Sequence, residues 1–438
     1  MPSTGRASFF CLHFLFPLIL VAQQTHAAIA PLNLQSPKVE ALPEMSVRVR
    51  LNVVEGPFSI TGVDLRYVGM LQAPISGGYQ AIRVRPGTRV ADFVEWIIED
   101  RDRGTLLARI KARSFEVSGK NLRLNLKPIP GRLTLLPQDR NKKGLQVIAN
   151  IDLEAYVRGV LPAEMPKGWP LEALKAQAIA ARTFALYRKA TKQDAQAFNR
   201  LPAYDLESTV MDQMYMVPEE AAERQLGLEN VERAVRETQG MVLLSMSERP
   251  LPLAAYFHAD CGGRTEDARR VWGAPGAGTA IDGACPLNPR ATWQLSISLK
   301  EITQRLRSAI RKPAPIEIYE IGLLERNSSE RVSELKLKWS DGDTSVISSH
   351  DFRMAIGHEK IKSTNFEITR VVEKNKSVVF SGKGFGHGVG LCQWGARRLA
   401  QGGADYRRIL NHYYPQSSIA LTTALHLGQK SAPIAFNP

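Results

Sequence analysis

The amino-acid sequence predicts an α+β protein with a strand-rich N-terminal part, a central helical catalytic region and a mixed α/β C-terminal part. The first observation is the clean alternation of apolar and polar residues at 46–51, which is typical of half-buried strands. The second is the segment 171–188, which contains neither glycine nor proline and repeats apolar residues at spacings of three and four. The third is the return of alternating segments after residue 330, followed by two short helical patterns.

The composition is that of a globular protein with a basic surface. The chain has 438 residues, of which 44% are hydrophobic and 23% are charged, and these fractions argue against a largely disordered chain. At one domain per ~150 residues, the length predicts two or three structural units or one large unit. The formal net charge of +14 favours polyanions such as nucleic acid, anionic lipid or an acidic wall polymer. A generally basic surface is the alternative, so charge alone does not choose.

The first thirty residues have the pattern of a secretory signal. Arg6 is the only charged residue before an apolar run at 9–22, and residues 28–30 read Ala-Ile-Ala, the form of a cleavage site. An uncleaved anchor is the alternative, but the run is short and contains Pro17. No later run of the sequence reaches the ~20 apolar residues that cross a bilayer. We therefore expect export to the periplasm or cell-wall space, no transmembrane span in the mature chain, and no nucleic acid as partner.

Periodicity predicts the elements in chain order. The N-terminal part has alternating segments at 46–51, 82–85, 122–126 and 144–149, and one short helix at 90–99. The central part has helices at 170–188 and 219–238 and a strand at 241–244. The C-terminal part has a helix at 299–310, strands at 335–339 and 378–380, and helices at 393–401 and 405–413.

These patterns divide the chain into consecutive regions. We expect a signal peptide, a proline-punctuated tether, a β-rich N-terminal region, a catalytic region, a mixed C-terminal region that completes the cleft, and a tail. Their predicted limits are 1–30, 31–45, 46–145, 146–285, 286–425 and 426–438.

The densest chemical signal lies at 152–188. Glu164 stands between Pro162 and Pro166, which predicts a carboxylate on a stiff loop. Lys175 and Arg182 follow on the next helix, seven positions apart, and a rotation of about 700° puts them on one face. One acid beside a cationic helix face suits a polymer with acidic groups. A helix-capping carboxylate and a solvated helix face explain the same residues without any function.

A glycine-rich loop at 382–390 precedes a predicted helix. A strand, a glycine loop and a helix invite a dinucleotide-binding interpretation, but fewer than fifty residues follow and the chain is predicted to be exported. We interpret the loop as a bare backbone that a bulky ligand can approach, with His387 as the polar group presented there. A histidine that only stabilises the loop is the alternative.

Three cysteines remain once Cys11 leaves with the signal. Cys261 and Cys285 are predicted to form a disulfide, because export favours oxidation, and Cys392 is then a packed thiol. The alternatives are a zinc site of His258, Cys261 and Cys285, or free thiols. No cofactor is therefore predicted, with zinc as the less favoured choice.

These blocks together resemble one family. The segments 161–183, 384–396 and 409–415 resemble the sporulation protein D (SpoIID)/LytB family of exported peptidoglycan proteins. The segment 256–265 also fits, and the likeness extends over about 45–419.

The resemblance implies specific roles for residues of this chain. Catalytic members are lytic transglycosylases that cleave glycan strands stripped of stem peptides, and their catalytic glutamate matches Glu164. Their substrate-contacting cations match Lys175 and Arg182. Other members enhance an N-acetylmuramoyl-L-alanine amidase without being enzymes. Further residues expected to line the cleft are Gln213, Tyr215, Gly386, His387, Gln393 and Tyr414.

The resemblance leaves the metal unsettled. Some members bind zinc through one histidine and two closely spaced cysteines. Here Cys285 lies 24 positions after Cys261, which departs from that spacing. We therefore expect a lyase acting on peptidoglycan, with glycan strands and a cell-wall amidase as partners. A non-enzymatic glycan-binding amidase enhancer is the alternative.

Overall fold

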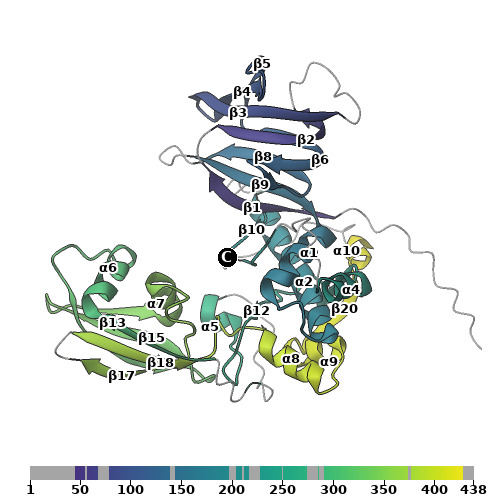
Figure 1. Ribbon diagram of the computed structural model, residues 1–438. Helices are drawn as coiled ribbons and strands as arrows, with labels where there is room; N and C mark the ends of the chain where they lie inside the picture. The colour runs from purple at the N-terminus through teal and green to yellow at the C-terminus, as the bar shows by residue number, and fades with distance from the viewer. Residues whose placement is uncertain are drawn as a thin grey trace, which may run out of the picture. The chain divides into compact units, whose positions relative to one another are not determined.

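The computed structural model describes residues 45–54, 57–67, 78–138, 144–196, 204–209, 212–216, 227–248, 250–273, 285, 291–372 and 376–427. The predicted signal peptide, nearly all of the tether and most of the tail lie outside these residues, so their assignments stay predictions. The structure confirms the α+β class (Figure 1). Among the described residues, no helix combines the length and the apolar character that crossing a bilayer requires.

The N-terminal part forms one ten-stranded sheet. Its order is β10-β1-β9-β8-β6-β2-β3-β4-β5, with the short β7 paired to β6, and Figure 1 shows this ladder with β5 at one end. All pairs are antiparallel except β1 with β10, where Val49 lies opposite Leu206. The strands are β1 (Ser46–Val54), β2 (Phe58–Tyr67), β3 (Tyr79–Val90), β4 (Phe93–Asp100), β5 (Leu106–Ala112), β6 (Phe115–Leu124), β7 (Lys127–Pro128), β8 (Arg132–Pro137), β9 (Leu145–Asp152) and β10 (Leu206–Glu207).

The short helix predicted at 90–99 is wrong. Instead β3 ends at Val90, the chain turns at Ala91 with a φ of 55°, and β4 begins at Phe93. Trp96 and Ile98 are both fully buried two positions apart, which is the period of a strand. The alternation of buried residues in β4 is present in the sequence. The pairing of β4 with β3 and β5, which identifies it as a strand, is visible only in the structure.

The central part is built around one long helix. This helix, α2 (Leu171–Gln196), contacts α1 (Leu153–Glu164), α4 (Glu229–Glu237), α8 (Gln393–Gln401), α9 (Tyr406–Tyr413) and β11 (Met241–Ser245). The predicted apolar stripe is buried, but so are Ala173, Ala176 and Ala180 outside it. The small alanine side chains let the surrounding helices approach closely, so α2 is buried on more than one face between 173 and 185.

Two strand pairs join distant segments to this helical layer. The antiparallel pair is β11 with β20 (Ser417–Leu421), and the parallel pair is β12 (Phe257–His258) with β19 (Leu391–Cys392). The short helices α5 (Ala268–Trp272) and α10 (Thr423–Leu427) follow β12 and β20. The chain's last segments are therefore tied to its middle, and β9 runs across the boundary predicted at 145. The domain division itself stays a prediction.

Residues 291–383 form a mixed part with its own core. In this part β13-β18-β17 and β14-β15-β16 are two three-stranded antiparallel sheets, and α6 and α7 pack against them (Figure 1). The helix predicted at 299–310 is confirmed, whereas α7 has no counterpart among the predicted elements. The elements are β13 (Thr292–Ser298), α6 (Leu299–Ile310), β14 (Ile318–Arg326), β15 (Val332–Trp339), β16 (Thr344–Ser348), α7 (Ser349–Ile356), β17 (Phe366–Val372) and β18 (Ser377–Lys383).

Candidate active site

Glu164 is the last residue of α1, whereas the sequence predicted a stiff loop. Pro162 is accommodated inside the final turn of the helix, and Pro166 follows its C-cap residue, Met165. Met165 closes that turn by donating its backbone N–H to the carbonyl oxygen of Leu161 at 2.9 Å. The carboxyl group therefore projects from the end of a rigid helix rather than from a loop.

Each oxygen of the Glu164 carboxyl group accepts one hydrogen bond. The backbone N–H of Met214 donates to Oε1 at 2.7 Å, and the side-chain amide of Gln393 donates to Oε2 at 3.2 Å. Met214 lies 50 positions and Gln393 229 positions further along the chain. The position of the carboxyl group is therefore set by three separate segments.

The environment of Glu164 favours its protonated form. The side chain is half-buried, and burial raises the pKa of its carboxyl group above the usual value. The hydrogen bonds from Met214 and Gln393 lower the pKa, but they offset only part of the burial. A carboxyl group that keeps its proton to higher pH suits general acid catalysis, and its conjugate base can take the proton back.

The loop at 212–216 reaches Glu164 because α1 has a glycine where the loop crosses it. Met216 donates its backbone N–H to Gly159 O at 3.2 Å. A Cβ atom at position 159 would collide with the ring of Tyr215 and would lie 2.6 Å from Met216 O. Tyr215 itself stacks on Tyr156 of α1, with ring centroids 5.4 Å apart. This close packing holds the Met214 N–H against the carboxyl group.

Gln213 and Tyr215 are inner supports of that loop. Gln213 is 1% exposed, accepts the hydroxyl hydrogen of Tyr156 at 2.7 Å, and donates to Ala181 O at 3.2 Å. Tyr215 is 7% exposed. These positions do not fit the predicted direct contact with a ligand, because the polar groups of Gln213 are used within the core.

Asp212, the acidic residue of the same loop, is engaged in an ion pair and a hydrogen bond. Its carboxylate pairs with Arg188 at 2.8 Å and accepts the backbone N–H of Glu207 at 2.8 Å. Its side chain is only 2% exposed. Asp212 is therefore engaged by Arg188 and Glu207 and does not offer a second acid–base group beside Glu164.

Gln393 is the first residue of α8, at the point where the parallel pair β12–β19 ends. Cys392 caps the helix, because its Sγ accepts the backbone N–H of Gly395 at 3.3 Å. Tyr414 is fully buried beneath β19 in the core. Its hydroxyl group accepts the N–H of Leu391 at 3.3 Å and donates to Tyr256 O at 2.6 Å, which links β19 to the segment before β12. Tyr414 is thus structural, and its burial does not fit the predicted place in the cleft lining.

Comparison with known proteins gives partial matches to one family. The family model of Stage II sporulation protein matches residues 141–244, the segment that carries Glu164 and Met214. The chain is 29% identical over 274 residues to stage II sporulation protein D of Bacillus amyloliquefaciens, covering 61% of this chain and 74% of that one. These similarities support a place for the chain in the SpoIID/LytB family of cell-wall proteins. A model called Domain of unknown function (DUF8618) matches residues 288–390.

Two further relatives show where the family likeness is partial. An uncharacterized protein of Brachyspira hyodysenteriae is 35% identical over 270 residues, which are 61% of this chain and 66% of the relative. A protein of Bacillus subtilis named amidase enhancer is 27% identical over 309 residues, covering 60% of this chain and 40% of the enhancer. This chain therefore spans less than two thirds of the length of either of these two relatives.

Lys175 is engaged by acidic neighbours. Its ammonium group lies 2.8 Å from Glu172 and 2.7 Å from Glu237, and its side chain is 12% exposed. Burial lowers the pKa of Lys175, but the hydrogen bonds to both glutamates outweigh it, so the pKa is raised overall. Lys175 therefore joins α2 to α4, and its predicted contact with a substrate would require breaking two ion pairs.

Arg182 is fully buried, so the predicted substrate contact does not fit its position. Its guanidinium group makes a two-pronged ion pair with Glu154 at 2.7 and 2.8 Å and also donates to Met241 O at 3.0 Å. Glu154 in turn accepts the N–H of Gly240 at 3.1 Å. The shared helix face of Lys175 and Arg182 was predicted correctly, but that face packs inward.

The glycine loop approaches the segment around His258, and no described contact of His387 reaches Glu164. Gly386 has a φ of 109°, and a Cβ atom there would lie 2.7 Å from His258 Cβ. The Nδ1 atom of His387 accepts the N–H of Val389 at 3.0 Å, and its ring packs against Trp272 at 5.0 Å. Burial lowers the pKa of His387 well below its usual value, so the ring is neutral. Gly386 and His387 therefore shape the loop.

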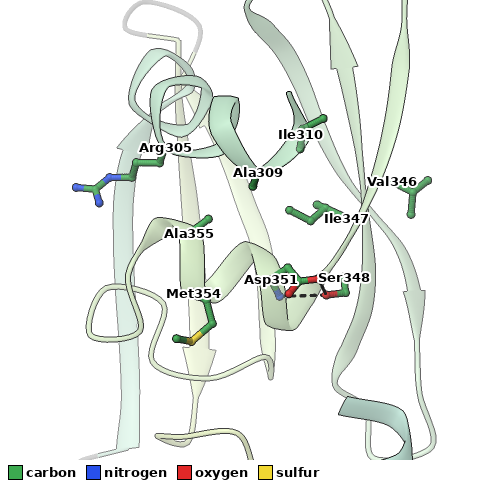
Figure 2. A pocket seen from close by; sticks show the side chains of 9 residues that line it. All are labelled: Arg305, Ala309, Ile310, Val346, Ile347, Ser348, Asp351, Met354 and Ala355. Carbon is green, nitrogen blue, oxygen red and sulfur yellow. Dashed lines mark hydrogen bonds between the residues drawn. The ribbon is translucent and has the colours of Figure 1, made fainter. Parts of the chain in front are cut away.

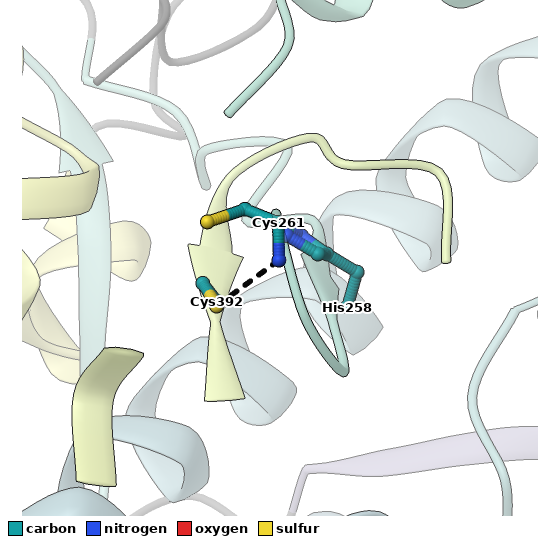
Figure 3. Close-up of side chains that lie close together, drawn as sticks. All are labelled: His258, Cys261 and Cys392. Carbon is teal, nitrogen blue, oxygen red and sulfur yellow. Dashed lines mark hydrogen bonds between the residues drawn. The ribbon is translucent and has the colours of Figure 1, made fainter. Parts of the chain in front are cut away.

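Cys261 and Cys285 stand as thiols in the structure, and the disulfide between them stays a prediction. All three described cysteines are buried and unbridged. Cys285 Sγ lies 3.5 Å from Cys392 Sγ, and Cys392 Sγ also accepts the N–H of Cys261 at 3.3 Å. Figure 3 shows His258 and Cys261 on one segment with Cys392 on the strand beside them. Three cysteine side chains and an imidazole thus lie close together.

A cationic group beside Gln393 was not among the residues predicted from the sequence. Arg397 lies one turn further along α8, so the two side chains share a helix face. Its guanidinium carbon lies 4.8 Å from the ring centroid of Trp394 and 5.3 Å from that of Trp169. Within the described part of the chain, Arg397 makes no ion pair and its Nε has no hydrogen-bond partner. The i, i+4 spacing from Gln393 was the signal that could have found it.

A cavity of about 790 Å³ lies elsewhere, between α6, α7 and β16. Figure 2 shows its side chains, among which Asp351 and Ser348 bond to each other. None of the predicted site residues lines it. The candidate site is therefore the surroundings of Glu164.

Proposed function

We propose that this protein is a lytic transglycosylase that acts outside the cytoplasm on peptide-stripped peptidoglycan strands. The observation that carries the proposal is the Glu164 carboxyl group, which has a raised pKa and a donor fixed on each oxygen. The predicted secretory signal supports export.

The proposed reaction uses one carboxyl group twice. Protonated Glu164 donates its proton to the glycosidic oxygen between N-acetylmuramic acid and N-acetylglucosamine, and the bond from that oxygen to the muramyl anomeric carbon breaks. The 6-hydroxyl of the same muramyl residue attacks that carbon, and the Glu164 carboxylate takes the hydroxyl proton. The products are a free N-acetylglucosamine hydroxyl and a 1,6-anhydro-muramyl end, and no water is consumed.

This mechanism explains why one acid suffices. Ordinary glycosidases need a second carboxylate to activate water or to act as nucleophile. Here the nucleophile is part of the substrate and is already held near the reacting carbon. The engagement of Asp212 with Arg188 supports this assignment, because it leaves Glu164 to act alone.

Arg397 is the proposed contact for the substrate's own charge. A muramyl residue without its stem peptide carries a free lactyl carboxylate, whereas an attached peptide converts that group to a neutral amide. Arg397 is stacked on two indole rings and unpaired within the described residues, so it can pair with a carboxylate without losing another partner. This assignment replaces the roles predicted for Lys175 and Arg182.

The second candidate function is a non-enzymatic glycan-binding protein that stimulates a cell-wall amidase. The relative named amidase enhancer favours it. Both functions need a surface that meets glycan, so the residues around the site do not separate them. Substitution of Glu164 separates the two functions, because only the enzyme needs the proton of its carboxyl group.

The deciding experiment compares the wild-type protein with Glu164→Gln. Glycan strands are stripped with an amidase, incubated with each protein, and analysed by mass spectrometry for ends lighter by one water than those of hydrolysis. We expect anhydro ends with the wild type alone. Stimulation of an amidase by both proteins, with anhydro ends from neither, would establish the enhancer function instead.

A further inference from the structure

Four buried side chains with metal-binding atoms meet where the parallel pair β12–β19 forms. The ligand atoms of His258, Cys261 and Cys392 all lie within 4.8 Å of one another. The sulfur of Cys285 lies 3.5 Å from that of Cys392. His258 is 4% exposed, and none of the three cysteines is more than 1% exposed. The four residues come from three segments that are far apart in the sequence.

The imidazole of His258 is oriented as in metal-bound histidines. Its Nδ1 lies 3.0 Å from the carbonyl oxygen of Val389, so Nδ1 carries the hydrogen and donates it. Its Nε2 then has a lone pair, and this buried atom has no hydrogen-bond partner in the described residues. A backbone carbonyl that fixes one ring nitrogen while the other faces a ligand is the usual second-shell arrangement at zinc.

We propose that His258, Cys261, Cys285 and Cys392 bind one structural zinc ion. Two thiolates at ~2.3 Å from a tetrahedral zinc ion lie ~3.8 Å apart, close to the separation of Cys285 and Cys392. Three sulfurs and one imidazole nitrogen form a closed set of soft ligands, which selects zinc over magnesium or calcium. This inference is independent of the proposed function, because it concerns ligands that do not touch Glu164.

A buried arginine supplies the charge that such a site needs. Zinc with three thiolates and a neutral imidazole carries one net negative charge. Arg331 is fully buried and donates its Nη2–H to Cys261 O at 2.7 Å. The guanidinium group fits there because position 388 is glycine, where a Cβ atom would lie 2.6 Å from it. The positive charge of Arg331 therefore lies beside the ligand loop and offsets the charge of the bound site.

The zinc ion would also fix the position of α8, which provides Gln393 to the candidate active site. Cys392 is both a ligand and the N-cap of α8, and the next residue, Gln393, donates to Glu164. Binding of one ion by ligands from 258–261, 285 and 392 joins these segments before α8 begins. The bound ion would therefore hold the start of α8 close to the end of α1.

The test measures bound metal in the full chain, expressed with a tag that contains no histidine and purified without added metal or chelator. We expect about one zinc per chain by elemental analysis, released when a mercurial reagent blocks the thiols. Replacement by cobalt should give the charge-transfer absorption of thiolate ligation. Each of His258→Gln, Cys261→Ser, Cys285→Ser and Cys392→Ser should lose most of the zinc, whereas the control His358→Gln should keep it.

The outcomes separate this inference from its rivals. Absence of stoichiometric zinc in the wild type overturns the site whatever the variants do, and a Cys261–Cys285 disulfide in non-reducing peptide maps would then be the arrangement in its place. Retention of zinc by any of the four variants at wild-type affinity overturns the ligand set. The metal measurement needs no activity, so an inactive but zinc-loaded protein would refute the proposed function and leave this inference standing.

Discussion

Gln393 donates its side-chain amide hydrogen to the carboxyl group of Glu164, although 229 positions separate the two residues. The contact joins the end of α1 to the start of α8. It means that the site is complete only when the C-terminal segment has returned to the central helices. The loop that provides Met214 adds a third segment to the same carboxyl group.

The raised pKa of Glu164 predicts that its ionised side chain destabilises the folded protein at neutral pH. The folded pKa exceeds the unfolded one, so the native state binds more protons between the two values and stability falls as pH rises through that window. Glu164→Gln removes the ionised form, and we expect a higher melting temperature than the wild type at neutral pH. The difference should shrink as pH falls towards the ordinary glutamate pKa of ~4.3.

Thermal melts of both proteins between acidic and neutral pH check this prediction. Glu229→Gln, at the first residue of the surface helix α4, is the control and should show no such pH-dependent gain. A Glu164→Gln variant that is less stable than the wild type at neutral pH would mean that the ionised carboxylate holds the site together.

Gln393→Met should shift the pH dependence of glycan cleavage. The hydrogen bond from Gln393 favours the carboxylate form of Glu164 and lowers its pKa, and Met fills similar space without a donor. The pKa should therefore rise further, and the alkaline side of the pH–rate profile should move to higher pH. Initial rates of anhydro-end formation across pH measure it. An unmoved profile with a lower rate would show that Gln393 contacts the substrate instead.

Gly159→Ala should lower activity although alanine is the better helix former. The added methyl group would collide with the ring of Tyr215 and with Met216 O, so the loop must move and Met214 loses its reach to Glu164. We expect a fall of about tenfold or more in the rate, corresponding to at least ~1.4 kcal/mol of lost positioning. Gly168→Ala, where a Cβ atom meets nothing within 4 Å, is the matched control. Equal rates for the two variants would contradict the positioning role of the loop.

Most helices could be predicted from the sequence, but the contacts that their side chains make in the folded protein could not. The limits of α6 and α8 follow from periodicity and caps, and Glu164 followed from its motif. The helical face of Lys175 and Arg182 was also correct, yet its cations are paired inward, because spacing along a helix does not say what packs against it. The role of Cys392 was missed because its partners are more than a hundred positions away and meet it only through β12–β19.

Arg182→Ala should act on stability rather than on substrate choice. It leaves Glu154, only 15% exposed, without its ion-pair partner, and breaking such a pair costs about 3–5 kcal/mol. Denaturant unfolding should show this loss, while the KM of the remaining folded enzyme for stripped strands stays near the wild-type value. A KM that rises on stripped strands without a loss of stability would restore the substrate contact predicted from the sequence.

Arg397→Ala should weaken the discrimination between stripped and intact strands. If Arg397 pairs with the lactyl carboxylate, its removal costs binding only where that carboxylate is free, and an intact strand offers a neutral amide instead. The KM for stripped strands should then rise by about 5- to 30-fold, since a partly desolvated charge pair contributes roughly 1–2 kcal/mol. The cleavage of intact wall should change little. Arg398→Ala, the exposed arginine next to it on α8, removes the same charge from another face and should leave both substrates unaffected. Initial rates on amidase-treated and untreated strands decide the matter: equal losses on both would mean that Arg397 only supports Trp169 and Trp394, and the carboxylate of the substrate would then be read elsewhere.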